Sequence, residues 1–212
     1  MDQQKIIALD EKSLERRCKQ LAKRDVHLRF ILKTYGVPPL WKREEGFATL
    51  VHIILEQQVS LASALAAFTR LKKTVTHVTP QKFLKLDDLT LRSIGFSRQK
   101  TLYCRTLAQA VIEKRIDFNA LRKMSDEEVR ATLKSLKGIG DWTVDIYLLM
   151  ALARPDAWPN GDLGLIIAVQ RIKQYPSRPT PLDLNSLAET WRPFRAVAAR
   201  LLWHYYLSNQ SK

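Results

Sequence analysis

The sequence predicts an all-α fold. Apolar residues recur at spacings of three and four along most of the chain, which is the pattern of amphipathic helices. Only 7 of the 212 residues are glycine, and one short segment, residues 74–79, has the composition of a strand. With 46% hydrophobic residues the chain can bury a core, in one domain or in two closely fused subdomains.

The expected helices follow these stripes in chain order. Residues 1–45 have helical character, and six further stripes lie at 47–54, 61–68, 103–111, 142–153, 165–172 and 194–205. Ser125 with Glu128 three residues later forms a capping box, which predicts a helix that runs to about Lys137. The Pro-rich stretches at 176–181 and around Pro38–Pro39 are expected to be loops.

The net charge says more about the partner than about the fold. The chain carries 35 Lys+Arg and 21 Asp+Glu, a net charge of +14, which favours a polyanion or an anionic membrane surface as partner. No apolar run approaches the roughly 18 residues of a membrane span, and the first residues lack the apolar core of a signal peptide. We therefore expect an intracellular protein without a membrane partner, cytoplasmic at a bacterial nucleoid or nuclear in a eukaryote.

The cysteines and histidines predict no metal site. Cys18 and Cys104 lie far apart and form no CxxC pair, which excludes a disulfide scaffold and a cysteine-built zinc or iron–sulfur site. The four histidines show no ligand spacing and are expected to be structural or surface residues, namely His27, His52, His77 and His204.

One acidic stretch interrupts the basic chain. Within residues 138–170, Arg154 alone stands against four aspartates, Asp141, Asp145, Asp156 and Asp162. Chance variation on solvated faces explains such a stretch. The alternative is a carboxylate held inside a site that a basic surface brings to a polyanion.

The segment LKGIGDWTVDIY at 136–147 predicts a helix-hairpin-helix. Gly138 and Gly140 allow a tight turn and the close approach of another backbone. The second helix then begins near Asp141 with its free N–H groups pointing outward, and these groups, together with Thr143 and Lys137, are expected to bind phosphate.

With this hairpin, the sequence resembles a known family. The hairpin and the following WPNGDLGL at 158–165 are similar to the helix-hairpin-helix DNA glycosylase superfamily, and most to its 3-methyladenine DNA glycosylase II (AlkA-type) branch. Two further blocks agree, ILEQQVS at 54–60 and WRPFRAVAARLLW at 191–203. The resemblance implies one glycosylase domain over residues 1–212, with the hairpin at about 125–154. It also implies two closely packed helical subdomains with a substrate cleft between them, the N-terminal and C-terminal helices together in one.

Asp162 is the candidate catalytic residue. It follows a turn-forming segment and precedes an apolar helix, so on its own it is equally well an N-cap aspartate. The two roles are compatible, because a helix N-terminus favours the ionised carboxylate that a cationic transition state requires. The resemblance implies that Asp162 stabilises an oxocarbenium-like sugar and assists the attacking water. The other three aspartates of the acidic stretch are weaker candidates.

The resemblance also implies the type of reaction and the residues that contact the substrate base. Bifunctional members carry a Lys two positions after the second hairpin Gly; here this position is Trp142, which implies a monofunctional hydrolase without lyase activity. Trp142 and Trp203 match pocket aromatics that suit a flipped, cationic alkylated purine. The branch often has a Tyr four residues after Trp142, but Ile146 stands there. Tyr147, one step on and rotated by about 100° around the helix, is the candidate substrate-binding residue in its place.

The resemblance places further DNA contacts in two segments. Gln57 matches a residue near the lesion and Gln58 matches the wedge that fills the gap left by the flipped base, although two adjacent amides could simply be a polar helix end. Arg98 and Lys100 resemble a backbone-contacting region, or equally a solvated charged face.

These readings combine into an expected function. We expect a monomeric DNA glycosylase that excises alkylated purines from duplex DNA in base excision repair and needs no cofactor. Whether the hairpin binds a monovalent cation is left open. Deaminated, etheno or oxidised bases are alternative substrates. A non-catalytic helix-hairpin-helix DNA-binding module is the alternative outside the enzymes.

Overall fold

The computed structural model describes residues 8–210, and over that range every regular element is helical. The predicted all-α fold is therefore confirmed. The chain divides into two compact units. The terminal unit consists of the chain up to Lys42 and from Leu148 onward, and the central unit of Arg43–Tyr147.

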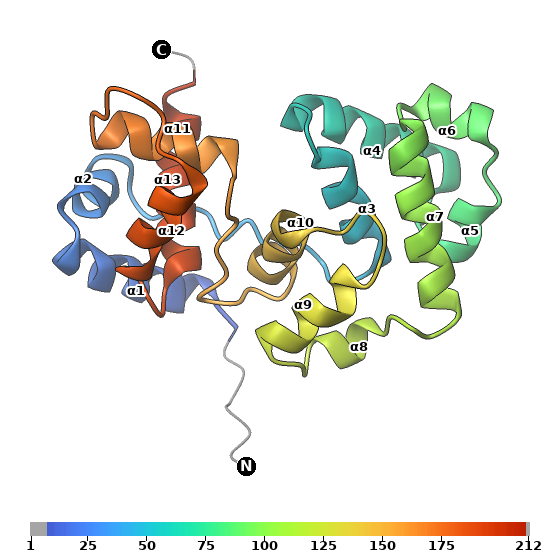
Figure 1. Cartoon of the computed structure of the whole chain (residues 1–212), viewed down its shortest axis with the longest axis horizontal. Helices are drawn as coiled ribbons and strands as arrows, with labels where there is room; N and C mark the ends of the chain where they lie inside the picture. The colour runs from blue at the N-terminus through green and yellow to red at the C-terminus, as the bar shows by residue number, and fades with distance from the viewer. Residues whose placement is uncertain (1–7, 211–212) are drawn as a thin grey trace. The chain divides into compact units, whose positions relative to one another are not determined.

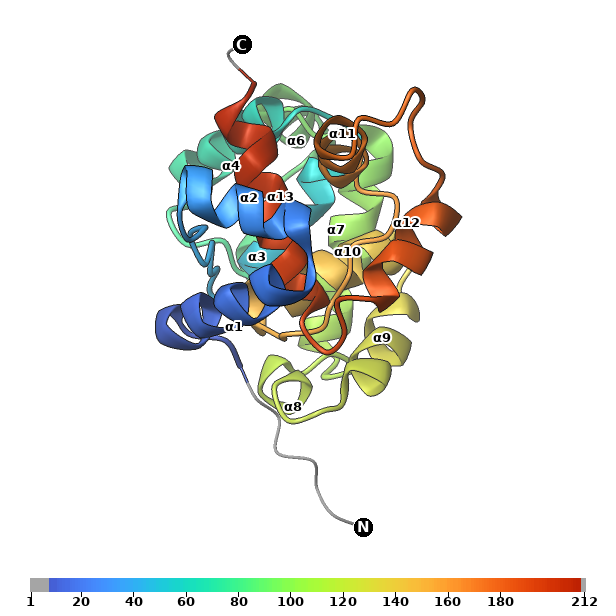
Figure 2. The same ribbon diagram turned by 90° about the vertical axis from the view of Figure 1, so that its left-hand side faces the viewer.

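The terminal unit is built around its last helix. Its elements are α1 (Glu11–Arg24), α2 (Val26–Tyr35), α11 (Leu163–Ile172), α12 (Pro181–Glu189) and α13 (Arg195–Ser208). Helix α13 contacts all four others, and Figures 1 and 2 show α1 and α2 lying against it.

Helix α13 is buried on every side from Ala196 to Trp203. The prediction of a single apolar stripe along this segment was therefore too narrow. The small residues of α13 let four neighbouring helices approach, and a helix surrounded in this way has no solvent face that would need polar residues.

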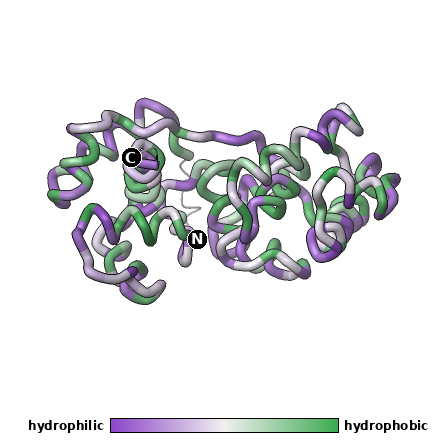
Figure 3. Tube along the Cα trace, turned by 90° about the horizontal axis from the view of Figure 1, so that it is seen from above, coloured by the Kyte–Doolittle hydropathy of each residue, from purple (hydrophilic) through white to green (hydrophobic). Residues whose placement is uncertain are grey.

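The central unit contains eight helices among the described residues: α3 (Phe47–Glu56), α4 (Leu61–Val75), α5 (Pro80–Leu84), α6 (Asp88–Ile94), α7 (Arg98–Ile112), α8 (Phe118–Leu121), α9 (Asp126–Lys134) and α10 (Asp141–Ile146). Helix α3 forms its core and contacts α4, α7 and α10. A π-helical turn, Tyr147–Ala151, follows α10. In both units apolar and polar residues alternate along the helices, as the hydropathy colouring in Figure 3 shows.

The predicted stripes coincide with helices, with three differences. The stripe at 142–153 spans α10 and the π-helical turn and extends two residues past them, to Ala153. Residues 74–79 have the composition of a strand but form none, because α4 continues to Val75 and is capped by Thr76, whose φ is +59°. The apolar face of α4, which buries Leu71, outweighs the strand preference of the β-branched residues. The helix that opens at the Ser125–Glu128 capping box ends at Lys134 rather than at about Lys137.

Candidate functional site

Asp162 caps α11 and is held by two donors. A turn stabilised by the bond from the Asp162 N–H to the Pro159 carbonyl (3.2 Å) brings it to the helix start. Its Oδ1 accepts from the Leu165 N–H at 3.0 Å and from the indole Nε1–H of Trp203 at 2.9 Å. The carboxylate is half-buried. The N-cap geometry predicted for Asp162 is thus present, and the indole donor fixes the orientation of the carboxylate as well.

Gly164 leaves room for this carboxylate. A Cβ atom at this position would lie 3.2 Å from Asp162 Oδ1 and 3.4 Å from both Trp203 Cδ1 and Tyr206 Cδ1. The distance to Asp162 Oδ1 is shorter than an ordinary van der Waals contact, so a side chain here would push against the aspartate. The structure therefore adds Gly164 and Tyr206 to the surroundings of Asp162.

The other three aspartates of the acidic stretch pair with basic side chains. Lys134 Nζ donates to Asp141 at 2.6 Å, and Arg130 donates to the buried Asp145. Asp156 accepts from two arginines, Arg192 and Arg195, at 2.8 Å each. Each of these three carboxylates therefore joins neighbouring elements of its own unit.

The hairpin joins α9 to α10 through two glycines with different requirements. Gly138 has φ +90°, and a Cβ there would lie 2.1 Å from Cγ of the Tyr103 ring, so the ring packs directly on the Gly138 backbone. Ile139 is buried between the two glycines. Gly140 is the N-cap of α10 without a side-chain capping bond, and a Cβ there would meet nothing within 4 Å. Only Gly138 is therefore fixed by packing.

Gln57 binds the hairpin. Its Nε2 donates to the Gly138 carbonyl and to Thr143 Oγ1, both at 2.9 Å. Thr143 is 2% exposed, which differs from the prediction: the hydroxyl of Thr143 faces Gln57 in the interior instead of being presented to a phosphate. A role of Gln57 near the lesion stays a prediction, and its side chain already has partners within the central unit.

The segment after α3 is supported from α7. Lys100 Nζ donates to the Leu55 carbonyl at 2.7 Å, and burial lowers the pKa of Lys100. Its ammonium thus satisfies one of the last carbonyls of α3, a contact that neither the predicted DNA-backbone role nor the alternative of a solvated charged face included. Gln58 is exposed and has φ +55°, a region that residues with side chains rarely adopt. Arg98 is exposed at the first position of α7.

The remaining predicted residues differ in their accessibility. Lys137 is exposed and Trp142 is half-buried. Tyr147 is fully buried and its ring lies 6.3 Å from that of Phe118. The structure therefore places Tyr147 in the core of the central unit, which differs from its predicted role as a substrate-binding residue.

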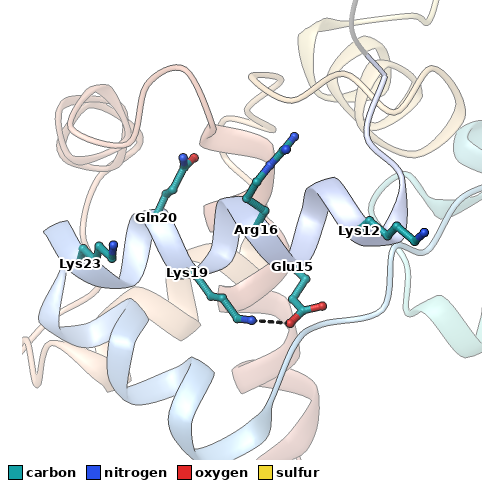
Figure 4. A pocket seen from close by; sticks show the side chains of 6 residues that line it. All are labelled: Lys12, Glu15, Arg16, Lys19, Gln20 and Lys23. Atoms are coloured by element: carbon teal, nitrogen blue, oxygen red, sulfur yellow. Dashed lines mark hydrogen bonds and ion pairs between the residues drawn. The ribbon is translucent and has the colours of Figure 1, made fainter.

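A shallow groove runs along α1 and contains none of these residues. It is lined by Lys12, Glu15, Arg16, Lys19, Gln20 and Lys23, with the Lys19–Glu15 ion pair at 2.6 Å (Figure 4). Within residues 8–210, no group of three or more His, Cys, Asp or Glu residues could hold a metal ion, and no helix in that range has the length and apolar character to cross a bilayer.

Over residues 8–210 the structure thus combines an all-helical fold with a Gly-Ile-Gly hairpin between two helices and an N-cap aspartate after a Pro-containing turn. The chain belongs to the HhH-GPD superfamily of base excision DNA repair proteins, whose family profile matches residues 51–193. The predicted family is therefore confirmed.

Similar proteins carry closely related names. The chain is 28% identical to DNA-3-methyladenine glycosylase 1 of Schizosaccharomyces pombe, over 93% of this chain and 92% of the relative. Among solved structures, the 3-methyladenine DNA glycosylase of the same yeast in complex with abasic DNA superposes with a TM-score of 0.83 at 28% identity, over 89% of this chain and 95% of that one. The DNA-3-methyladenine glycosidase of Bacillus halodurans gives a TM-score of 0.76 at 27% identity, over 92% and 91%.

Proposed function

We propose that this protein is a monofunctional DNA glycosylase that hydrolyses the N-glycosidic bond of alkylated purines of the 3-methyladenine and 7-methylguanine type in duplex DNA. The observation that carries the proposal is the Asp162 carboxylate, held by the Leu165 N–H and the Trp203 indole N–H. The names of the similar proteins support the substrate class.

The mechanism follows from a fixed carboxylate. As the bond between sugar and base breaks, positive charge develops on the sugar, and a preorganised negative group lowers the barrier without having to reorient. Asp162 would stabilise this cation and orient the attacking water. Alkylation makes the purine a good leaving group, and Trp142 stands where a lyase would need an amine, so hydrolysis would leave an intact abasic strand.

The DNA contacts in this proposal lie on three segments of the central unit: the hairpin, the start of α7 and the residues after α3. Lys137, Gly138, Gly140 and Arg98 would hold the phosphate backbone, and the exposed Gln58 would fill the gap left by the flipped base. Such backbone contacts read no sequence, which suits a search for damage. We further infer a monomer that acts at the nucleoid or in the nucleus and needs no cofactor.

Replacing Asp162 with asparagine tests the proposal. Asparagine is also a good N-cap, and its amide oxygen accepts the same two N–H groups, so the fold and the affinity for undamaged duplex are expected to survive. Release of 7-methylguanine from methylated DNA should fall at least about a hundredfold in a single-turnover assay. Asp141→Asn is the matched control, since it removes an exposed carboxylate of the same acidic stretch.

The outcomes separate the candidate functions. Full activity of Asp162→Asn would refute the catalytic assignment. A wild-type protein that binds duplex DNA but leaves no alkali-sensitive abasic sites would be a non-catalytic binding module instead. Release of deaminated, etheno or oxidised bases in preference to alkylated ones would keep the reaction and change the substrate.

A further inference from the structure

Trp41 is an accessible indole next to the indole that holds Asp162. Its ring is half-buried, whereas Trp203 is only 8% exposed. The two rings meet edge to face, with centroids 6.4 Å apart and planes at 71°. Because Trp203 donates to Asp162 Oδ1, Trp41 is one ring removed from the carboxylate. Of the two tryptophans, Trp41 is therefore the more accessible to solvent.

The backbone at Trp41 has an unusual conformation that a neighbouring side chain stabilises. Trp41 has φ +47°, which residues with side chains rarely adopt unless their surroundings enforce it. The fully buried Arg200 provides this constraint, since its Nε donates to the Leu40 carbonyl at 3.0 Å. The same guanidinium donates to the carbonyls of Leu149 at 2.6 Å and Ala196 at 3.1 Å.

Helix α13 thus positions Trp41 at both its backbone and its ring. Arg200 and Trp203 are three residues apart and share a helix face. His204, the next residue, also meets the Trp41 ring at its edge, with centroids 6.4 Å apart. Trp41 is therefore held more firmly than a loop residue that only fills space, by a buried guanidinium at its backbone and by two ring contacts.

From this arrangement we infer that Trp41 is the aromatic surface on which the flipped base stacks, and that its indole face favours cationic alkylated purines over neutral bases. The inference rests on the proposed function and assigns a specificity-determining residue to it. The electron-rich face of an indole attracts a cation held over it and stacks any planar base. Trp41 is therefore expected to contribute more to binding of 7-methylguanine than to binding of hypoxanthine, which is neutral.

Trp41→Phe and Trp41→Leu separate stacking from packing, because both keep an apolar bulk and only the first keeps an aromatic face. The kcat/KM for a duplex with one 7-methylguanine should fall roughly tenfold in Trp41→Leu, and less on hypoxanthine. Trp41→Phe should lie between Trp41→Leu and the wild type. Phe30→Leu, which changes a 50% exposed aromatic residue on α2, is the control and should leave both values unchanged.

A second measurement keeps the two proposals distinct. In an Asp162→Asn background the base stays attached, and the preference for the 7-methylguanine duplex over the undamaged duplex should fall in Trp41→Leu. Equal values for the Phe and Leu variants, or equal losses on both bases, would overturn the role of Trp41. A wild-type protein that releases no base would overturn the proposed function, while the binding preference would still report on Trp41.

Discussion

Replacing Gln57 with glutamate tests whether this side chain holds the hairpin. The two side chains have nearly the same shape, but the carboxylate cannot donate to the Gly138 carbonyl or to Thr143 Oγ1, where the amide now lies at 2.9 Å. The Thr143 hydroxyl can donate to the carboxylate instead, but the Gly138 carbonyl loses its donor, which costs about 1–3 kcal/mol. For a chain of this length, about 2 kcal/mol lowers Tm by roughly 4–8 °C.

The matched control is Gln58→Glu, which makes the same change of charge at the next, exposed residue. Surface substitutions of this kind stay within about 0.5 kcal/mol. Thermal unfolding followed by circular dichroism compares the two variants directly. DNA affinity does not discriminate between them, because each adds a negative charge to a surface expected to bind phosphate. Equal Tm values for the two variants would refute the inference that Gln57 stabilises the hairpin. A contact with DNA would then be its only predicted role.

Three further predictions follow from the site. Gly138→Ala should lower the free energy of unfolding by at least about 2 kcal/mol, since it combines a positive φ with a collision against Tyr103. Gly140→Ala should lower it by less than about 1 kcal/mol. Denaturant titrations of both variants measure the difference. Trp203→Phe removes a donor to a charged acceptor, worth about 1.5–3 kcal/mol, so single-turnover base release should slow by about 10- to 100-fold; an unchanged rate would contradict the positioning role. Affinity for undamaged duplex should fall by orders of magnitude between about 50 and about 200 mM salt, and a flat salt dependence would contradict backbone binding.

The features that the sequence predicted correctly are local ones. The helices, the capping box at Ser125 and the N-cap geometry of Asp162 each depend on residues within about one turn of each other. Their spacing is therefore visible in the sequence. The hairpin is local too, and its two glycines mark the turn, although nothing in the spacing shows that Gly138 lies under the Tyr103 ring.

The features that the sequence did not reveal depend on distant residues. Trp203 is 41 positions from the carboxylate to which it donates, and Gln57 is 81 and 86 positions from its two acceptors. Side chains such as these have several chemically reasonable partners, and only the packing of helices selects one. For the same reason the sequence could not show which basic side chains pair with Asp141, Asp145 and Asp156.

The contacts around the hairpin have a mechanical consequence. Lys100 fixes the end of α3, Gln57 joins the following residue to the hairpin, and the Tyr103 ring of α7 packs on Gly138. The exposed Gln58, whose φ is positive, therefore projects from a segment that is tied to both α7 and the hairpin. If the hairpin holds the phosphate backbone, the position of Gln58 along the duplex is set by these bonds. A variant that weakens them should therefore impair base flipping even though it removes no contact with DNA.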